Sequence, residues 1–515
     1  MKLAELISNV GALPKGCDAS GDDPACNPEI STITCRSQDI IPGGLFVAVK
    51  GFAADGHDYI EQAVELGASA VVCERPAEVD IATVTVDNSR KALAELASVF
   101  YGHPSEDMVV IGITGTNGKT TTSYLIESIL RAAGFSVGVI GTINYRYGGR
   151  LYDNPVTTPE SVDLQRILSQ MRQGGVTHVV MEVSSHALDL YRVHRCCFDL
   201  AVFTNLTQDH LDYHQNMEQY WACKRRLFME LLPAWDGKLR HRAVLNVAVP
   251  KGRELALEMT LPFLSCGEND ESDIYALAAQ YDLTGTSTCI HTPLGEANLI
   301  SPLVGRHNLE NILNAVGAGI AIELPLETIV QGVESLGNVP GRLERIANDH
   351  RRFVYVDYAH TPDALESALL ALRALTPDRI ICVFGCGGDR DRAKRPKMGS
   401  IAGRLSDLAV VTSDNPRTEP PQQIIEEIVA GMLPRCDLKY SMDELASGFK
   451  GRGYAVISDR RAAIGTAIRA SRPGDTILIA GKGHEPYQVI GRRRLAFDDR
   501  AEAETALAGL SWTGR

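Results

Sequence analysis

One short segment constrains the fold of this 515-residue chain more than any other: Gly115–Thr120, with the sequence Gly-Thr-Asn-Gly-Lys-Thr. The apolar run Met108–Ile113 precedes it, and a stretch with helical character, Thr121–Ala133, follows it. A new apolar run begins near Ser136. Continuous apolar runs are typical of buried parallel strands. The pattern therefore predicts a β-α-β unit in which a tight glycine-rich loop joins the first strand to the helix.

The composition of this loop indicates a phosphate site. Glycines let backbone N–H groups turn toward an anion, and the helix N-terminus adds partial positive charge. Lys119 can reach the terminal phosphates of ATP, and the Thr120 hydroxyl can ligate Mg2+. Ile113 stands where the usual Gly-x-x-x-x-Gly-Lys-[Ser/Thr] motif begins with glycine. The alternative is a plain strand-to-helix turn with a chance lysine.

Length and apolar pattern predict three α/β domains, because 515 residues exceed one ordinary hydrophobic core. We predict a small domain over residues 1–102, a parallel-sheet domain over 103–340 and a third domain over 341–515. In the last range, polar or glycine-rich clusters follow almost every apolar run, and ligands bind at the carboxyl ends of strands in open α/β sheets. The runs are Arg352–Val356, Arg379–Phe384, Leu408–Thr412, Tyr454–Ile457 and Asp475–Ala480.

The net charge and the apolar pattern disfavour several classes of partner. A formal net charge of -13 disfavours broad binding to nucleic acid, which needs a cationic surface. No apolar run is long enough to cross a bilayer, and the N-terminus lacks the apolar core of a signal peptide. The twelve cysteines show no paired zinc spacing. We therefore expect a cytoplasmic protein without membrane insertion or nucleic-acid partners, and we also expect a monomer.

Several polar side chains are candidates for a metal site. Glu182 directly follows an apolar run, where a carboxylate can hold Mg2+ or, alternatively, serve as a cap or surface residue. His210 and His214 are one helical turn apart, so a zinc pair is conceivable, but no glutamate follows His210 as in metalloproteases. We prefer the interpretation that the segment with His210 and His214 lies beside bound phosphate or Mg2+. Packing or capping is the alternative for His214. Spacing alone makes Lys224 a solvated helix lysine.

Taken together, the motifs resemble the Mur ligase family, ATP-dependent amide-forming enzymes of peptidoglycan precursor synthesis. Their order and spacing agree over nearly the whole chain. The motifs are Gly115–Thr120, Glu182–His186, Thr204–Leu206, Asp209–Asp212, Tyr220 with Lys224, Gly305–Asn308, Gly341–Arg342, Asp357–Pro362 and Gly385–Asp391. Asp414–Arg417 resembles the signature of the members that add meso-diaminopimelate, and lysine-adding members differ there.

The resemblance implies an α/β fold of three domains: a UDP-substrate domain, a central P-loop parallel-sheet ATPase domain and a C-terminal Rossmann-like domain for the incoming amino acid. It also implies a reaction. Such an enzyme joins meso-2,6-diaminopimelate to the D-glutamate of UDP-N-acetylmuramoyl-L-alanyl-D-glutamate through an acyl phosphate, with ATP and Mg2+ as cofactors and ADP and phosphate as products. Its partners would be these small molecules.

The resemblance further implies four groups of site residues. Those for ATP are Gly115, Thr116, Asn117, Gly118, Lys119, Thr120, Thr121, Asn308, Arg342 and Asp357. Those for Mg2+ are Thr120, Glu182 and His210, with Lys224 carbamylated into an anion that supports a metal. Those for the UDP-muramoyl peptide are Ser37, Thr157, Thr158, Ser184 and Arg192. Those for diaminopimelate are Arg390, Asp414, Asn415, Pro416, Arg417, Gly481 and Glu485.

The diaminopimelate assignment agrees with the chemistry of the residues. Arg390 and Arg417 can bind a carboxylate in bidentate fashion, and Glu485 can accept from an ammonium. The basic run Arg390–Lys397 could instead be a nucleic-acid patch, but the net charge of -13 and its place after a glycine-rich strand end argue against this.

Three other functions agree with parts of the sequence. A lysine-adding ligase or a folylpolyglutamate synthetase of the same superfamily is disfavoured by Asp414–Arg417. A P-loop ATPase that drives motion or assembly leaves the polar strand ends of residues 341–515 unexplained. A non-catalytic nucleotide-binding module is disfavoured by the presence of Lys119, Glu182 and Lys224.

Overall fold

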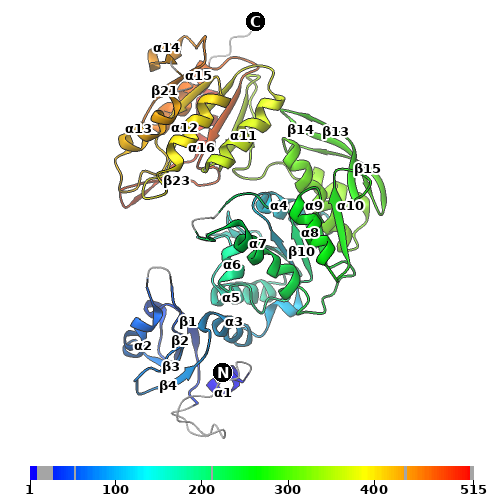
Figure 1. Ribbon diagram of the computed structural model, residues 1–515, viewed down its shortest axis with the longest axis vertical. Coiled ribbons are helices and arrows are strands. Elements are labelled where there is room, and N and C mark those ends of the chain that lie inside the picture. Colours follow the sequence, from blue (N-terminus) through cyan, green and yellow to red (C-terminus); the bar gives the residue numbers. More distant parts are fainter. Residues whose placement is uncertain (9–26, 52–53, 210–212, 434–435, 437, 511–515) are drawn as a thin grey trace. The chain divides into compact units, whose positions relative to one another are not determined.

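The computed structural model describes residues 1–8, 27–51, 54–209, 213–433, 436 and 438–510. Over these residues the chain is a mixed α/β protein with three large sheets, which confirms the predicted fold class (Figure 1). It divides into two compact units, one of residues 1–276, 290–297 and 310–333, the other of residues 277–289, 298–309 and 334–515. No helix in the described ranges is long and apolar enough to span a membrane.

The first sheet has four parallel strands in the order β1-β2-β3-β4. Side chains alternate between its faces, so Leu45 and Val47 pack with α1 and α3, whereas Phe46 packs with α2. Both faces are buried, which explains the continuous apolar runs. The elements are α1 (Leu3–Ile7), β1 (Thr32–Thr34), η1 (Ser37–Asp39), β2 (Gly44–Val47), η2 (Gly56–Tyr59), α2 (Ile60–Glu65), β3 (Ala68–Cys73), β4 (Ala82–Thr85) and α3 (Ser89–Phe100).

The second sheet contains the predicted phosphate loop, and its strands follow the order β15-β14-β13-β12-β11-β10-β5-β9-β6-β7-β8. Strand β5 has parallel neighbours on both sides, so the loop leaves from the middle of the sheet. The strands are β5 (Val109–Thr114), β6 (Val137–Ile140), β7 (Tyr145–Tyr147), β8 (Arg150–Tyr152), β9 (His178–Glu182), β10 (Leu200–Phe203), β11 (Ala243–Asn246), β12 (Phe263–Gly267), β13 (Ile274–Asp282), β14 (Gly285–Thr292) and β15 (Gly295–Ser301).

Helices join these strands, and α4 packs against β5, β6 and β9. The pairing of Ile113 with both Glu182 and Val202 brings the carboxyl ends of β5, β9 and β10 together. The helices are η3 (Pro104–Asp107), α4 (Lys119–Ala132), α5 (Ser161–Gln173), α6 (Ser185–Asp189), α7 (Met217–Arg226), the π-helix η4 (Leu227–Leu231), α8 (Pro250–Glu258), α9 (Arg306–Ala321) and α10 (Leu326–Glu334).

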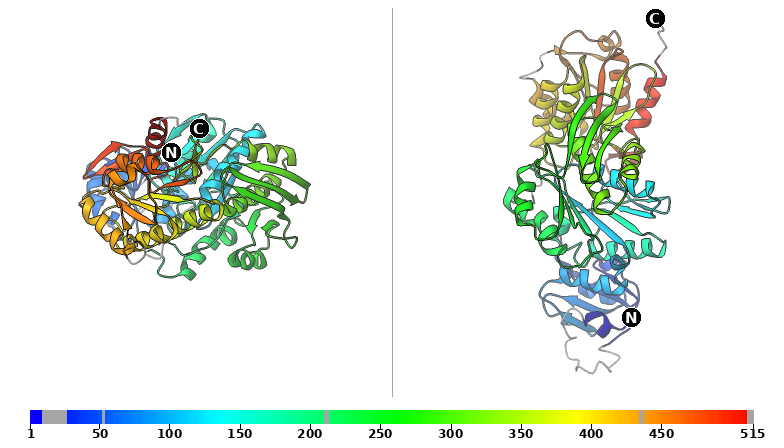
Figure 2. Two further views of the ribbon diagram at one scale, coloured as in Figure 1. Left: turned by 90° about the horizontal axis from the view of Figure 1, so that it is seen from above. Right: turned by 90° about the vertical axis from the view of Figure 1, so that its right-hand side faces the viewer.

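The third sheet has the order β16-β17-β22-β18-β19-β21-β20, and all its strands except β16 run parallel. Two hydrophobic cores pack against this sheet. Helix α12 contacts both α11 and α13, and these three helices share one core, whereas α15 and α16 belong to the second core (Figures 1 and 2). The elements are β16 (Glu344–Ile346), β17 (Phe353–Asp357), α11 (Pro362–Leu375), β18 (Ile380–Phe384), α12 (Lys394–Leu405), β19 (Leu408–Val411), α13 (Pro421–Met432), β20 (Leu438–Lys439), α14 (Met442–Ala446), β21 (Gly453–Val456), α15 (Arg460–Ala470), β22 (Thr476–Ala480), the hairpin β23 (Tyr487–Ile490) and β24 (Arg493–Ala496), and α16 (Asp499–Ala508).

The apolar runs predicted the buried strands well. All five runs after residue 341 are strands, and the run Leu200–Phe203 is β10. The strands without a continuous apolar run, among them β7, β13 and β23, were not anticipated, because their burial alternates or is slight. The three large sheets lie within residues 1–102, 103–340 and 341–515, and the domain boundaries themselves stay a prediction.

A buried histidine at the start of β9 predicts acid sensitivity. The ring of His178 stacks on Phe135 with centroids 4.0 Å apart, and burial, with a smaller effect of the charge of Lys238, lowers its pKa to about 4. In the unfolded chain a histidine takes up its proton near pH 6.5. The stability that neutral His178 contributes above about pH 6.5 is therefore lost as the pH falls toward about 4.

We expect His178→Phe, which keeps the stacked ring without the titration, to gain melting temperature relative to the unmodified protein as the pH falls from about 7 to about 4.5. Melting curves of both proteins at each pH measure this difference, and the other titrating groups cancel in the comparison. A difference that does not change with pH would contradict the assignment.

Candidate functional site

The loop after β5 depends on two glycines that allow close approach. Gly115 has φ +149°, and a Cβ there would lie 1.9 Å from Thr204 Oγ1. Gly118 has φ +85°, and a Cβ there would lie 2.2 Å from Asn311 Oδ1 on α9. Neither position accepts a side chain without moving its neighbours. Lys119 begins α4, so the loop ends at a helix N-terminus, as the sequence predicted.

The segment after β10 fixes the shape of this loop. The backbone N–H groups of Thr116 and Asn117 donate to the backbone and side-chain oxygens of Asn205, both at 2.9 Å. The Thr204 hydroxyl donates to Asn117 O at 2.6 Å, and Thr207 N donates to Thr116 Oγ1 at 3.0 Å. The sequence placed Thr204–Leu206 in a motif without giving Asn205 a role, although its position directly after a strand was a signal.

Two lysine ammonium groups meet at one carbonyl of the loop. Lys119 Nζ donates to Gly115 O at 2.8 Å and to Thr116 O at 2.7 Å. Lys224 Nζ, from α7, also donates to Gly115 O at 2.8 Å and lies 4.4 Å from the ring centre of Tyr220. Lys224 is only 1% exposed, so it is not the solvated lysine that spacing alone suggested. Burial, and then the charge of Lys119, lower its pKa well below the usual value.

Glu182 and Thr120 come together beside this loop. The Thr120 hydroxyl donates to Glu182 Oε2 at 3.0 Å. Thr142 donates its backbone N–H to Oε1 at 3.0 Å and its hydroxyl to Oε2 at 2.9 Å. Glu182 is 1% exposed, which excludes a surface role. Thr142 was missed, because the short segment after β6 carries no recognisable motif.

The histidine pair is only partly described. His210 lies outside the described residues. His214 Nε2 lies 2.9 Å from Ser185 Oγ, and its Nδ1 lies 3.8 Å from Cys223 Sγ, so both ring nitrogens have side-chain neighbours. In the part of the chain that the structure describes, no group of three or more His, Cys, Asp or Glu side chains could hold a metal ion. The zinc alternative therefore gains no support from these residues.

Four of the five residues predicted for the muramoyl peptide surround the end of β9. The Thr158 hydroxyl donates to Glu182 O at 2.8 Å, and Ser184 N donates to Thr158 Oγ1 at 3.2 Å. Arg192 Nη1 donates to Thr158 O at 3.1 Å, and Thr157 Oγ1 lies 3.1 Å from Thr142 Oγ1. These residues therefore gather around the backbone carbonyl of Glu182 and the hydroxyl of Thr142.

The fifth residue, Ser37, lies on η1 of the first sheet, where its hydroxyl donates to Gln62 Oε1 at 2.7 Å. Its neighbour Arg36 forms an ion pair of 2.5 Å with Asp163 on α5. Among the described residues, Ser37 itself forms no hydrogen bond with the group at the end of β9.

The other compact unit contains the remaining residues predicted for ATP. Asp357, at the end of β17, accepts from Leu343 N at 2.6 Å and Ala359 N at 2.8 Å. Burial raises its pKa, and the nearby Arg342 guanidinium acts in the opposite direction. Asn308 is buried and donates to Val304 O at 2.9 Å. The Arg342 guanidinium and the Asp357 carboxylate are thus close together.

The residues after β19 and β22 form a second polar cluster. Asn415 donates its amide N–H to Glu485 Oε2 at 2.9 Å, and its Oδ1 accepts from Lys482 Nζ at 3.1 Å. Asp414 Oδ1 lies 3.8 Å from the same Lys482 Nζ. A Cβ at Gly481, where φ is +118°, would lie 2.6 Å from Asp414 Oδ2. Four predicted diaminopimelate residues therefore lie together.

Lys482 at the centre of this cluster was missed by the sequence analysis. Its side chain is 0% exposed. Burial lowers its pKa, while the carboxylate of Asp414 acts in the opposite direction. The signal was present, since Lys482 lies inside the glycine-rich cluster after β22, but only the packing shows that its amine reaches Asn415.

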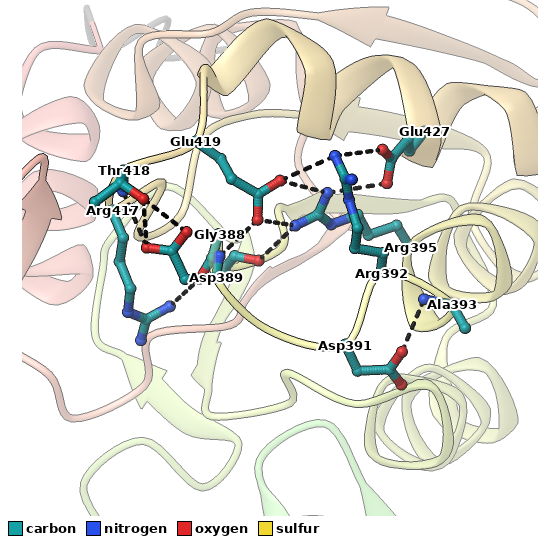
Figure 3. Close-up of polar contacts among 11 residues, drawn as sticks. Gly388, Asp389, Asp391, Arg392, Ala393, Arg395, Arg417, Thr418, Glu419 and Glu427 are labelled. Carbon is teal, nitrogen blue, oxygen red and sulfur yellow. Dashed lines mark hydrogen bonds and ion pairs between the residues drawn. The ribbon is translucent and has the colours of Figure 1, made fainter. Parts of the chain in front are cut away.

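Arg417 and Arg390 lie on the neighbouring loops. Arg417 has φ +51° and donates from Nη1 to Gly388 O at 2.7 Å, next to Pro416 (Figure 3). The side chain of Arg390 is exposed. Arg392 and Arg395 are paired with Glu419 and Glu427, so part of the basic run 390–397 is neutralised (Figure 3). This pairing weakens the nucleic-acid interpretation.

Comparison with known families matches three consecutive segments. Residues 29–101 match the Mur ligase family catalytic domain, residues 113–319 the Mur ligase middle domain, and residues 341–483 the Mur ligase glutamate ligase domain. The first segment contains the first sheet, and the second contains the phosphate loop. The third contains Asp414, Asn415, Gly481 and Lys482 of the second polar cluster.

Relatives and solved structures agree with the match to the Mur ligase family. UDP-N-acetylmuramoyl-L-alanyl-D-glutamate--2,6-diaminopimelate ligase of Geobacter metallireducens is 50% identical over 489 residues, which are 95% of this chain and 96% of the relative. A solved structure of a ligase with the same name is 32% identical, with a TM-score of 0.67 over 93% of this chain and 95% of that chain. MurF ligase from Thermotoga maritima in complex with ADP is 20% identical and shares the fold, with a TM-score of 0.59 over 93% and 96% of the two chains. Because a relative at half identity spans nearly the full length of both chains, this chain belongs to the Mur ligase family.

Proposed function

We propose that this chain is an ATP-dependent ligase that joins meso-2,6-diaminopimelate to the D-glutamate of UDP-N-acetylmuramoyl-L-alanyl-D-glutamate. The observation that carries this proposal is the polar cluster after β19 and β22. There Asn415 forms hydrogen bonds with both Glu485 and Lys482, two residues before Arg417 in the chain. Such a cluster offers both signs of charge to an amino acid with an ammonium and a carboxylate at its far end. The name of the relative at 50% identity supports the same reaction.

In this proposal, each of the three regions binds a different substrate. Residues 1–102, with Ser37, bind the UDP end of the muramoyl substrate, and Thr157, Thr158, Ser184 and Arg192 bind its peptide. Residues 103–340 bind and activate ATP. Residues 341–515 bind diaminopimelate through Arg390, Asp414–Arg417, Gly481 and Glu485.

ATP binding rests on the loop Gly115–Thr120 and the first turn of α4. The helix N-terminus and Lys119 offer positive charge to the phosphates, and Thr121 lies in the same buried turn. We assign Asn308, Arg342 and Asp357 to the rest of the nucleotide. The ADP complex of the Thermotoga maritima relative supports the use of an adenine nucleotide by this fold.

The residues beside the loop also suit Mg2+. Glu182 and Thr120 present a carboxylate and a hydroxyl 3.0 Å apart, and Mg2+ prefers such hard oxygen donors. Mg2+ usually keeps few protein ligands and takes the rest from phosphate and water, which agrees with a small donor set. His210 is assigned to the same role from the family resemblance. Bound Mg2+ would offset negative charge on the phosphate oxygens.

We propose that Lys224 reacts with carbon dioxide to form a carbamate. The nitrogen lone pair of the neutral amine attacks the carbon of carbon dioxide, a C–N bond forms, and the nitrogen releases one proton. Only the neutral amine can do this, and the burial that lowers the pKa of Lys224 favours that form. The product is an anion held next to Lys119, whose ammonium would balance its charge.

The chemical steps follow from these positions. The D-glutamyl side-chain carboxylate attacks the γ-phosphorus of ATP, giving an acyl phosphate and ADP, while Lys119 stabilises the charge on the phosphoryl oxygens. The diaminopimelate amine then attacks the acyl carbon and loses a proton. The C–O bond breaks, and phosphate leaves with its electron pair.

Phosphate release measured with the UDP-muramoyl dipeptide, ATP and Mg2+ tests the proposal. We expect release with meso-diaminopimelate to exceed release with L-lysine by at least about a hundredfold, because lysine lacks the second, far carboxylate that the arginines would bind. Omitting the amino acid or the dipeptide should abolish release. Release without any amino acid would indicate a simple ATPase, and AMP with pyrophosphate would exclude the acyl-phosphate route.

A further inference from the structure

Two neighbouring loops carry the arginines that the proposed function assigns to diaminopimelate. Strands β18 and β19 are parallel and paired from Ile381 and Leu408 onward, so their following loops leave from the same edge of the sheet. We call residues 385–390 the glycine loop, which ends at Arg390. We call residues 414–419 the signature loop, which contains Arg417.

The backbones of these loops are in direct contact. Gly388 N donates to Asn415 O at 2.9 Å, and Arg417 Nη1 donates back to Gly388 O at 2.7 Å. A Cβ at position 388 would lie 1.9 Å from Pro416 O, so no side chain separates the two backbones there. The position of one loop therefore fixes the position of the other.

Both loops pass through a backbone conformation that side chains disfavour. Asp389 has φ +53° and Arg417 has φ +51°, and left-handed values are unusual for residues with a Cβ. The Asp389 carboxylate accepts from Thr418 N at 3.1 Å and from Thr418 Oγ1 at 2.8 Å (Figure 3). Since that carboxylate is engaged within the protein, it holds the turn from which Arg390 projects.

An ion pair with a buried arginine also supports the contact between the two loops. Arg395 on α12 is 0% exposed and donates from Nη2 and Nη1 to the two oxygens of Glu419, at 2.8 and 3.0 Å (Figure 3). Its Nη2 also reaches Gly387 O at 3.3 Å, and Glu419 Oε1 accepts from Asp389 N at 2.6 Å. One carboxylate thus contacts the helix and the glycine loop at once. The Arg395 guanidinium and the Asp389 N–H lower the pKa of Glu419 to about 2, so it is charged at neutral pH.

We propose that Glu419 and Asp389 are positioning residues that set the separation of Arg390 and Arg417, and thereby the preference for an amino acid with a second carboxylate. This inference rests on the proposed function. Neither residue needs to touch the substrate. Glu419 acts through Arg395 and Asp389 N, and Asp389 acts through Thr418.

The chain offers a matched control for the buried pair. Glu427 on α13 also accepts from Arg395, at 2.9 Å, but among the described residues its ion pairs are with Arg392 and Arg395 and not with the glycine loop. Glu427→Gln therefore perturbs the same arginine without altering the junction. Thr418→Ser and Thr418→Val form a second matched pair, because serine keeps the hydroxyl that donates to Asp389 and valine removes it.

The test compares steady-state constants of the purified full chain. We expect Glu419→Gln and Thr418→Val to raise the KM for meso-diaminopimelate about tenfold and to lower the preference over L-lysine by a similar factor, with the KM for ATP unchanged. Glu427→Gln and Thr418→Ser should stay within about twofold of the unmodified enzyme.

A merely structural role would lower the melting temperature of Glu419→Gln while leaving the KM for diaminopimelate and the lysine ratio unchanged, and this would overturn the inference. Equal changes in Glu419→Gln and Glu427→Gln would also overturn it. If Glu419→Gln does not fold, Thr418→Val decides by the same constants. The proposed function fails separately, since it fails when the unmodified enzyme releases phosphate without depending on diaminopimelate.

Discussion

Lys224→Ala is expected to lower kcat by about a thousandfold or more, although the residue lies on a helix that carries no other predicted catalytic group. The reason is the position of its amine, which lies 2.8 Å from Gly115 O in the phosphate loop and is excluded from water. Alanine removes both the group that we propose becomes a carbamate and its contact with the loop. Phosphate release under saturating substrates measures the loss.

Two further observations separate a carbamate from a simple structural lysine. A short carboxylic acid such as formate should partly restore Lys224→Ala, since it can occupy the space left by the missing side chain and supply an anion. It should not restore Lys224→Arg, which fills that space with a cation. Lys251→Ala is a control on a partly exposed lysine, expected to keep activity within about twofold. Full activity of Lys224→Ala would refute the carbamate role.

Glu182→Gln is expected to lower kcat by about a hundred- to a thousandfold and to raise the Mg2+ concentration needed for half-maximal activity. Glutamine has the same shape and can still accept from Thr142 N, so the end of β9 should stay in place. What disappears is the negative charge beside the Thr120 hydroxyl. Titrating Mg2+ at saturating ATP measures both effects.

Thr142→Ser serves as the control for this variant, because serine keeps the hydroxyl that donates to Glu182 Oε2. We expect its kcat to stay within about threefold of the unmodified enzyme. If Glu182→Gln kept more than a tenth of the activity with an unchanged Mg2+ requirement, Glu182 would be a structural carboxylate that orders Thr120 and Thr142.

The sequence allowed the local features of the fold to be predicted, because they depend on neighbours along the chain. The glycines of Gly115–Thr120 and the apolar run before them specify a strand, a loop and a helix without reference to other segments. Burial of Lys224 and Lys482 depends instead on packing against the segments that follow β5 and β19, so no spacing rule for a single helix or loop could reveal it.

For the candidate site, too, contacts between strand ends could be predicted, whereas contacts that depend on packing could not. Glu182 ends β9, and Thr120 lies at the start of α4 after the loop that follows β5. The sheet register brings the ends of β5 and β9 together, so the meeting of these side chains could be anticipated. Asn205 fixes the loop, and Thr142 fixes the carboxylate. Asn205 lies in the motif Thr204–Leu206, but the motif does not indicate its contacts, and Thr142 lies in no motif. Ser37 and Asn308 were assigned through resemblance alone, and their roles remain proposals.

The hydrogen bonds between Asn415 and the loop after β22 have a consequence for protein engineering. Asn415 bonds both Glu485 and Lys482, while Arg417 bonds Gly388. The proposed diaminopimelate signature is therefore one of three segments that hold one another in place. A graft of residues 414–417 alone into a lysine-adding homologue would lack its supporting partners. A transferable set of segments would have to extend through Glu419 and include residues 387–390, Arg395 and residues 481–485 as well.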